Sequence, residues 1–221
     1  MNEMTDSALS NIQSKFNHSE QVFLSFRTIY DFLLSFPEYK VWRKKHPALD
    51  LNDATHIEII YEKFINGKNF TLAYPKTKID SAVKEVLINA YDFDSITIDD
   101  VLKNHQFAML AENQIGDLLE KYLASKLEPL GWVWCSGSIV NKIDFIKKDD
   151  TNWRLLQIKN RATTENSSSS SVRNNTNIIK WYRLSNNGKS CWDKFPENQI
   201  TGLDESDFLK FIREESLKLK V

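Results

Sequence analysis

The stretch "IDFIKKDDTNWRLLQIKNR", which runs from Ile143 to Arg161, places Asp144, Gln157 and Lys159 in or beside apolar runs. The charged turn "KKDDTN" predicts a hairpin between two short strands. Residues two apart on a strand point to the same face, so we expect Gln157 and Lys159 to project together. The hairpin would bring Asp144 beside them. The sequence therefore predicts an oxygen-rich pocket with one ammonium group at its rim.

These ligand types fit a magnesium site, because Mg²⁺ prefers hard oxygen ligands in octahedral geometry and retains several waters. Asp144 would supply negative charge, while the side-chain oxygen of Gln157 and the backbone carbonyl of Ile158 would fill two further positions. Lys159 would orient or help deprotonate an attacking water and offset charge on a pentavalent transition state. The predicted chemistry is metal-assisted hydrolysis of a phosphodiester.

A helix before this hairpin offers a further acidic ligand. Glu112, Gly116 and Glu120 form an i, i+4, i+8 row beside the apolar stripe of that helix. A glycine inside a helix costs roughly 1 kcal/mol relative to alanine. Gly116 therefore suggests that a DNA backbone or a strand approaches the helix closely at that point. Glu120 is the preferred acidic ligand, and Glu112 is the alternative.

Together these residues resemble the PD-(D/E)xK nuclease fold, in its variant with glutamine at the second acidic position. The matching residues are Glu120, Asp144 and the run Gln157-Ile158-Lys159, and Gly116-xxx-Glu120 followed by Gly131-Trp132 is similar to the opening helix of several such nucleases. The resemblance covers roughly residues 108–217. Ile143 stands where the pattern has proline, and Gln157 replaces an acid, which removes one negative charge. The resemblance thus leaves open whether one or two metal ions bind.

Two longer stretches carry a narrower resemblance. "GWVWCSGSIVNKIDFI" and "QIKNRATTENSSSSSVRNNTNIIKWYR" are similar to the SinI type of restriction endonuclease, compact type II enzymes that cut within 5′-GG(A/T)CC. This resemblance implies Mg²⁺-dependent hydrolysis of double-stranded DNA to 5′-phosphate and 3′-hydroxyl ends. It also implies a homodimer acting on a near-palindromic site, without a nucleotide cofactor.

The distribution of charge supports a polyanionic partner. The whole chain has a net charge of −1, yet residues 154–194 contain eight Lys or Arg and two acids. A basic surface on a near-neutral protein favours a nucleic acid that binds one face, although a charge run can also be simply solvated.

The loop at about 161–183 is rich in Ser and Asn, a composition most often found in linkers. We expect it to order on DNA, where Arg and Asn can read base edges and hydroxyls can donate to phosphates. The candidate DNA-binding residues are Asn160, Arg161, Ser169, Ser170, Ser171, Arg173, Asn174, Asn175, Lys180 and Arg183.

The elements that must position these residues follow from periodicity. Residues 20–105 are expected to be largely helical, although the segment 57–65 could be helix or strand. Helices are expected at 97–105 and at 107–127, strands at 132–140, 142–146, 153–160 and 178–184, and a terminal helix at 206–219. The predicted class is α/β: a restriction-endonuclease-like core at 107–221, with a central mixed sheet flanked by helices. An N-terminal helical region at 1–106 would supply dimer contacts or flanking DNA contacts.

The composition indicates which class of protein and which cellular compartment to expect. The 221 residues are 41% hydrophobic and contain no apolar run long enough to span a membrane, and the polar N-terminus does not predict a signal peptide. With only Cys135 and Cys191, a disulfide framework and a zinc site are both disfavoured, and a reducing cytoplasm is the natural setting.

The function that we predict is a type II restriction endonuclease. Two alternatives stay open. One is a structure-selective repair or junction nuclease of the same fold. The other is a non-catalytic DNA-binding module, because Gln157 leaves the site with less negative charge than an acidic residue would.

Overall fold

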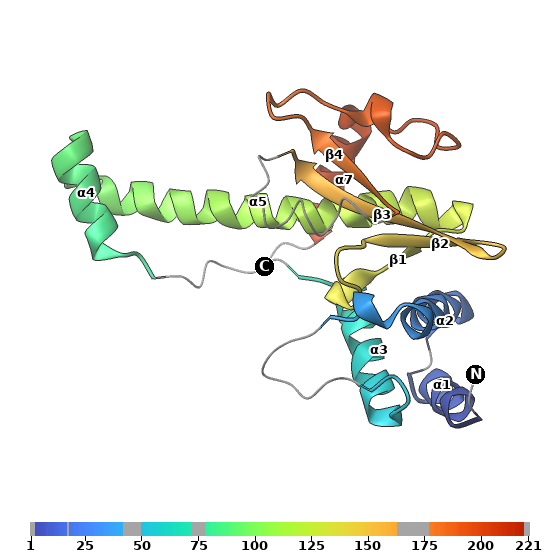
Figure 1. The fold of residues 1–221 in the computed structure, drawn as a ribbon. Helices are drawn as coiled ribbons and strands as arrows, with labels where there is room; N and C mark the ends of the chain where they lie inside the picture. Colours follow the sequence, from blue (N-terminus) through green and yellow to red (C-terminus); the bar gives the residue numbers. More distant parts are fainter. Residues whose placement is uncertain (1–2, 17, 42–49, 72–77, 163–176, 219–221) are drawn as a thin grey trace.

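A mixed four-stranded sheet forms the centre of the computed structural model, which describes residues 3–16, 18–41, 50–71, 78–162 and 177–218 (Figure 1). The strands follow the order β1 (Val133–Trp134), β2 (Phe145–Asp149), β3 (Asn152–Arg161) and β4 (Ile178–Leu184). β2 is antiparallel to both β1 and β3, whereas β3 and β4 are parallel. The predicted hairpin and the predicted mixed α/β architecture are therefore confirmed.

Helices cover both faces of this sheet. The described helices are α1 (Glu3–Phe16), α2 (Glu20–Ser35), α3 (Ala54–Lys68), α4 (Ser81–Tyr91), α5 (Ile98–Leu127) and α7 (Glu205–Lys218), and all of them except α4 pack against the sheet. Ile146 and Leu155 pack with the first three helices, and Phe145 and Leu156 pack with α5 and α7 on the other face. This alternation along β2 and β3 follows from the two-residue period of a strand. The segment 57–65, which could have been helix or strand, lies within α3.

The helix α5 is continuous across the position at which two helices were expected. It has 30 residues and includes both 97–105 (from Ile98) and 107–127. The sequence between them contains neither glycine nor proline, so nothing ends the helix there. The expected boundary between residues 106 and 107 thus falls inside one rigid element. In Figure 1, α4 and the N-terminal part of α5 extend away from the body of the molecule.

The first predicted strand is shorter than expected, and the second begins three residues later than expected. β1 stops at Trp134, a 3₁₀ turn (η3, Ser136–Ser138) follows, and β2 begins only at Phe145. The physical reason is the backbone: Gly137, Ser138 and Lys142 all have positive φ, which a regular strand does not accommodate. The chain therefore turns twice between β1 and β2.

Over the ranges that the structure describes, no helix is both long and apolar enough to cross a bilayer.

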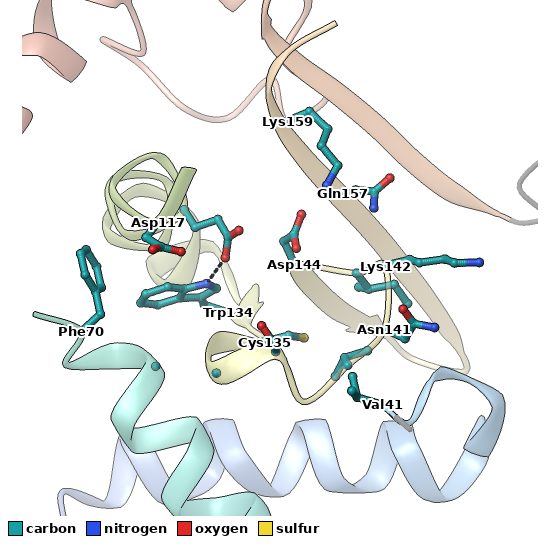
Figure 2. A pocket seen from close by; sticks show the side chains of 16 residues that line it. Val41, Phe70, Asp117, Trp134, Cys135, Asn141, Lys142, Asp144, Gln157 and Lys159 are labelled. Atoms are coloured by element: carbon teal, nitrogen blue, oxygen red, sulfur yellow. Dashed lines mark hydrogen bonds between the residues drawn. The ribbon is translucent and has the colours of Figure 1, made fainter. Parts of the chain in front are cut away.

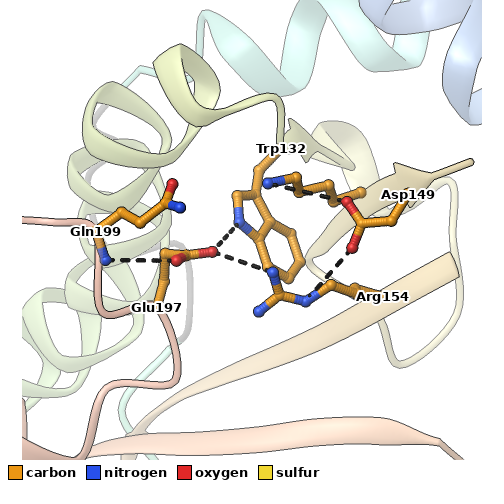
Figure 3. Close-up of polar contacts among 6 residues, drawn as sticks. Trp132, Asp149, Arg154, Glu197 and Gln199 are labelled. Carbon is orange, nitrogen blue, oxygen red and sulfur yellow. Dashed lines mark hydrogen bonds and ion pairs between the residues drawn. The ribbon is translucent and has the colours of Figure 1, made fainter.

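A polar network fixes the β2–β3 hairpin to the C-terminal part of the chain (Figure 3). The buried Glu197 carboxylate accepts a hydrogen bond of 3.0 Å from Trp132 Nε1 and lies 3.3 Å from Arg154 Nη1. Arg154 also stacks on the Trp132 ring and approaches Asp149. Burial of Glu197 is therefore compensated by both a donor and a cation. This network also engages one of the basic residues that were counted in 154–194.

A glycine-to-glycine contact joins the N-terminal helices to the turn after β1. A Cβ added at Gly67 in α3 would overlap the backbone of Gly137, and a Cβ added at Gly137 would overlap the Lys63 carbonyl. Ser136 Oγ also donates to the Phe64 carbonyl at 2.8 Å. Only glycine allows the two backbones to come so close.

We predict that Gly67→Ala and Gly137→Ala each lower the free energy of unfolding by about 2 kcal/mol or more, because an added methyl group must push two backbones apart. Urea unfolding followed by circular dichroism would measure this change.

Gly188→Ala is the matched control, since Gly188 has a φ of +74° but nothing within 4 Å of an added Cβ. It should cost only the left-handed backbone penalty of about 1–2 kcal/mol. A Gly67→Ala variant as stable as the wild type would contradict the close packing of α3 against η3.

Candidate functional site

A cavity of about 410 Å³ opens between the end of α3, the middle of α5, the β1–β2 connection and β3 (Figure 2). Its polar lining includes Asp117, Glu120, Asp144, Gln157 and Lys159. Four of the predicted site residues are therefore brought to one place from three separate segments of the chain.

Asp144 is held by the backbone of β3 on both sides of Gln157. Its own N–H donates to the Leu156 carbonyl at 2.9 Å, and its Oδ2 accepts a hydrogen bond of 2.6 Å from the Ile158 N–H. Asp144 thus extends the ladder between β2 and β3 by one residue while its carboxylate faces the cavity (Figure 2). The hairpin register places this carboxylate, and the Cys135 N–H, which donates to the Asp144 carbonyl at 2.8 Å, fixes the same residue from the other side.

Glu120 reaches the same cavity from α5. Trp134, buried in β1, donates from Nε1 to Glu120 Oε2 at 2.9 Å. Burial raises the pKa of Glu120 to about 8, and the nearby negative charge of Asp144 adds to that increase. Burial also raises the pKa of Asp144, against the opposing effects of the Ile158 N–H and Lys159. Two carboxylates in one poorly solvated site cannot both be charged at low cost without a cation between them.

Gln157 and Lys159 project into the cavity from β3, as their two-residue spacing predicts. They continue the face on which Leu155 packs against the N-terminal helices. Gln157 is only 5% exposed, and its side-chain amide makes no hydrogen bond to any residue that the structure describes. Because no fully buried side-chain N or O atom among the described residues is without a partner, the amide of Gln157 reaches the open space of the cavity, where a ligand can contact it. Lys159 is exposed, as expected for an ammonium at the rim.

The two candidate acidic ligands, Glu120 and Glu112, differ in their position relative to the cavity. Glu120 lines the cavity, whereas Glu112 is exposed and lies eight residues, or about 12 Å, further along α5. The expected approach of a strand to Gly116 is wrong, since no described atom lies within 4 Å of a Cβ added there. An approach of DNA remains a prediction.

Sequence reasoning missed two charged residues of the cavity lining. Asp117 precedes Glu120 by one helical turn, and burial raises its pKa. Its i, i+3 relation to Glu120 was the available signal. Lys142 lines the cavity from the β1–β2 connection and has a φ of +65°. No sequence signal indicated that conformation, because lysine rarely adopts it.

The predicted DNA-binding residues fall into three groups. Those in the loop lie outside the described residues: Ser169, Ser170, Ser171, Arg173, Asn174 and Asn175. Arg161 is exposed at the end of β3, and Lys180 pairs with Gln157 across the β3–β4 ladder. Paired residues share a face, so Lys180 lies on the cavity side of the sheet.

Arg183 has a structural environment instead of the expected DNA-facing one. It is 7% exposed, forms an ion pair with Glu205 and lies over the Phe208 ring. Its Nε also donates to Asn160 Oδ1 at 2.8 Å, which engages the oxygen of that predicted DNA contact. The alternation along β4 explains this arrangement, since Arg183 shares the face of the buried Trp181.

Comparisons with known proteins agree on one group. A family model described as SinI restriction endonuclease matches residues 9–217. The chain is 38% identical over 200 residues to the type II restriction enzyme Eco47I of Escherichia coli, covering 88% of this chain and 87% of that protein. It is 36% identical over 223 residues to the type II restriction enzyme SinI of Salmonella infantis, covering 99% of this chain and 95% of that protein.

The carboxylate pair predicts a pH-dependent stability in metal-free protein. The pKa of Glu120 is about 8 in the folded state against an ordinary 4.5, so folding is favoured while this carboxyl is protonated. That contribution is complete below the ordinary pKa and is lost as the pH rises through about 8. Wild-type protein in chelator should therefore lose stability between pH 5 and pH 9, as measured by urea unfolding at about five pH values.

Glu120→Gln removes this titration, so the variant should be more stable than the wild type at pH 9 and lose less stability with rising pH. Glu112→Gln, an exposed position on the same helix, is the control and should follow the wild type. If Glu120→Gln and Glu112→Gln show the same pH profile, Glu120 carries no raised pKa.

Proposed function

The chain belongs to the SinI restriction endonuclease family and is a type II restriction endonuclease, and we propose that the cavity between α5 and β3 is where it hydrolyses DNA. One observation carries the proposal: Glu120 and Asp144 meet in one cavity with Gln157 and Lys159. These are the side chains that the PD-(D/E)xK pattern requires, in its glutamine variant. We propose that fold for the core at residues 107–221, with the N-terminal helical region as an added part.

The donors in the cavity fit Mg²⁺. Two carboxylates with raised pKa values need a compensating cation, and the amide of Gln157 offers a hard oxygen without a partner among the described residues. No group of three His, Cys, Asp or Glu in the described ranges is arranged around one point. Waters, a DNA phosphate and the Ile158 backbone carbonyl would therefore complete the shell, as Mg²⁺ permits. A bound Mg²⁺ would act as a Lewis acid on the phosphate and lower the pKa of a water.

The chain's own residues then have separate roles. Asp144, fixed by two backbone hydrogen bonds, and Glu120, fixed by Trp134, would hold the cation. Lys159 would orient the attacking water and offset charge on the phosphoryl group. The water oxygen forms a bond to phosphorus while the bond from phosphorus to the 3′ oxygen breaks. The products are a 5′-phosphate and a 3′-hydroxyl end.

Recognition is proposed for Arg161 and Lys180 and for predicted loop residues that lie outside the described ranges: Ser169, Ser170, Ser171, Arg173, Asn174 and Asn175. They would contact double-stranded DNA at a short near-palindromic site, with GG(A/T)CC as the proposed sequence. A homodimer would match the two-fold symmetry of such a site. No nucleotide cofactor is proposed.

The two alternative functions, a junction-selective nuclease and a non-catalytic DNA-binding module, are now less well supported than a restriction endonuclease. The relatives are named as restriction enzymes, which disfavours both a binding module without activity and a junction-selective nuclease. Gln157 was the reason to consider an inert module, and its place beside two carboxylates gives it a use as a neutral ligand.

We predict that Asp144→Asn and Lys159→Ala each reduce plasmid cleavage at least about 100-fold, because each removes a group that acts at the reacting phosphate. Glu120→Gln should show a comparable loss, whereas Glu112→Gln should cleave like the wild type. Discrete fragments on an agarose gel, with sequenced ends, would measure both rate and site.

Binding measured with Ca²⁺ in place of Mg²⁺ separates chemistry from recognition. Asp144→Asn and Lys159→Ala should still bind the cognate duplex more tightly than a scrambled one. Cleavage that survives both substitutions would remove this cavity from consideration, and wild-type protein that leaves DNA intact with Mg²⁺ would contradict the proposed chemistry.

A further inference from the structure

The connection between β1 and β2 carries a lysine in an unfavourable backbone conformation. Lys142 has a φ of +65° and lines the cavity two residues before Asp144. The other non-glycine residues with positive φ in the described ranges have short polar side chains: Asp92, Ser138 and Asp150. Lysine rarely adopts this conformation, which aspartate tolerates better. A strained residue that its surroundings hold in place is typical of a functional site.

The chain around Lys142 is fixed on both sides. Before it, the Asn141 N–H donates to the Tyr39 carbonyl at 2.6 Å. After it, the Asp144 N–H donates to the Leu156 carbonyl at 2.9 Å. The N-terminal helical region and β3 therefore hold Lys142 in the left-handed conformation from opposite sides. Its side chain leaves the backbone in a set direction as a result.

The ammonium group of Lys142 has no partner in the described part of the protein. The side chain is exposed and forms neither an ion pair nor a hydrogen bond with a described residue. Figure 2 shows it on the opposite side of Asp144 from Asp117 and Trp134, directed away from the Asp144 carboxylate. Lys159 is the cation that lowers the pKa of Asp144 against the effect of burial. The charge of Lys142 is therefore available to an anion at the mouth of the cavity.

Two backbone donors belong to the same short segment. The N–H groups of Lys142 and Ile143 donate to no acceptor among the residues that the structure describes. Ile143 is 1% exposed and lines the cavity, and a backbone N–H in a buried segment ordinarily has an acceptor. Lysine side chains and backbone N–H groups are both common donors to DNA phosphates. An anionic oxygen at this rim would satisfy groups that the fold leaves unpaired.

We propose that Lys142, with the N–H groups of Lys142 and Ile143, holds a DNA phosphate next to the one that is cleaved. The inference rests on the proposed function, which places the scissile phosphate at Asp144. Two residues span at most about 7 Å, so Lys142 lies close enough to reach the neighbouring phosphate of the same strand. The carboxylates of the cavity repel a DNA strand, and a cation at its mouth offsets that repulsion. The contact would align the strand across the cavity.

The test is binding of the full chain to a cognate duplex in Ca²⁺ at several salt concentrations. Lys142→Gln should weaken binding about 10-fold and reduce the slope of log affinity against log salt by about 1, because one phosphate contact is lost. Lys142→Arg retains the charge and should keep the wild-type slope. Lys103→Gln is the matched control, since it removes the charge of an exposed lysine on α5 outside the cavity, and should change neither value.

A second measurement locates the phosphate. In a set of duplexes, one phosphate at a time near the cleaved bond is replaced by a neutral methylphosphonate. The wild type should lose affinity at a phosphate next to that bond, whereas Lys142→Gln should lose nothing further there. Equal losses in both proteins at every position would overturn the inference, and so would a wild-type salt slope in Lys142→Gln.

Stability distinguishes this contact from a purely structural role. Lys142→Gly relieves the left-handed conformation, so it should unfold at a urea concentration no lower than the wild type while binding DNA as weakly as Lys142→Gln. A less stable glycine variant would show that the lysine serves the fold, which contradicts the inference. These readouts require no cleavage, so their failure is distinct from failure of the catalytic cavity, which Asp144→Asn and Lys159→Ala test.

Discussion

The burial of two carboxylates, Glu120 and Asp144, in one cavity is the constraint on which the site depends. Burial raises the pKa of both carboxylates, and each raises the cost of charging the other. The fold tolerates this because Trp134 donates to one carboxylate and the Ile158 N–H donates to the other. The burial of these two carboxylates lowers the stability of the metal-free fold, and a cation bound between them would restore it. Such a loss of stability is a common feature of binding sites.

The helix α5 connects the three parts of this account. Its N-terminal part is tied to α4 by the ion pair of Lys84 with Asp99, its middle supplies Glu120 and Asp117 to the cavity, and its C-terminal part packs against the sheet and α7. The close contact of Gly67 with Gly137 fixes the opposite wall of the cavity to the N-terminal helices. One helix therefore connects α4, the carboxylates proposed to hold the metal ion and the core.

Local patterns predicted the hairpin and the shared face of Gln157 and Lys159, since both follow from the two-residue period of a strand. Long-range contacts could not be predicted in this way. The bond from Trp134 to Glu120 and the ion pair between Arg183 and Glu205 join residues whose proximity depends on how separate elements pack. The helices expected at 97–105 and 107–127 are one helix for a local reason, because no residue between them interrupts it.

The most direct test of the central claim is the effect of Mg²⁺ on the unfolding temperature, measured without DNA. The wild type should gain stability as Mg²⁺ rises, because an ion that binds only the folded state stabilises it. Asp144→Asn and Glu120→Gln should be more stable than the wild type in chelator and gain little from Mg²⁺. An equal Mg²⁺ response in the wild type and both variants would contradict the claim that these two carboxylates form the metal site.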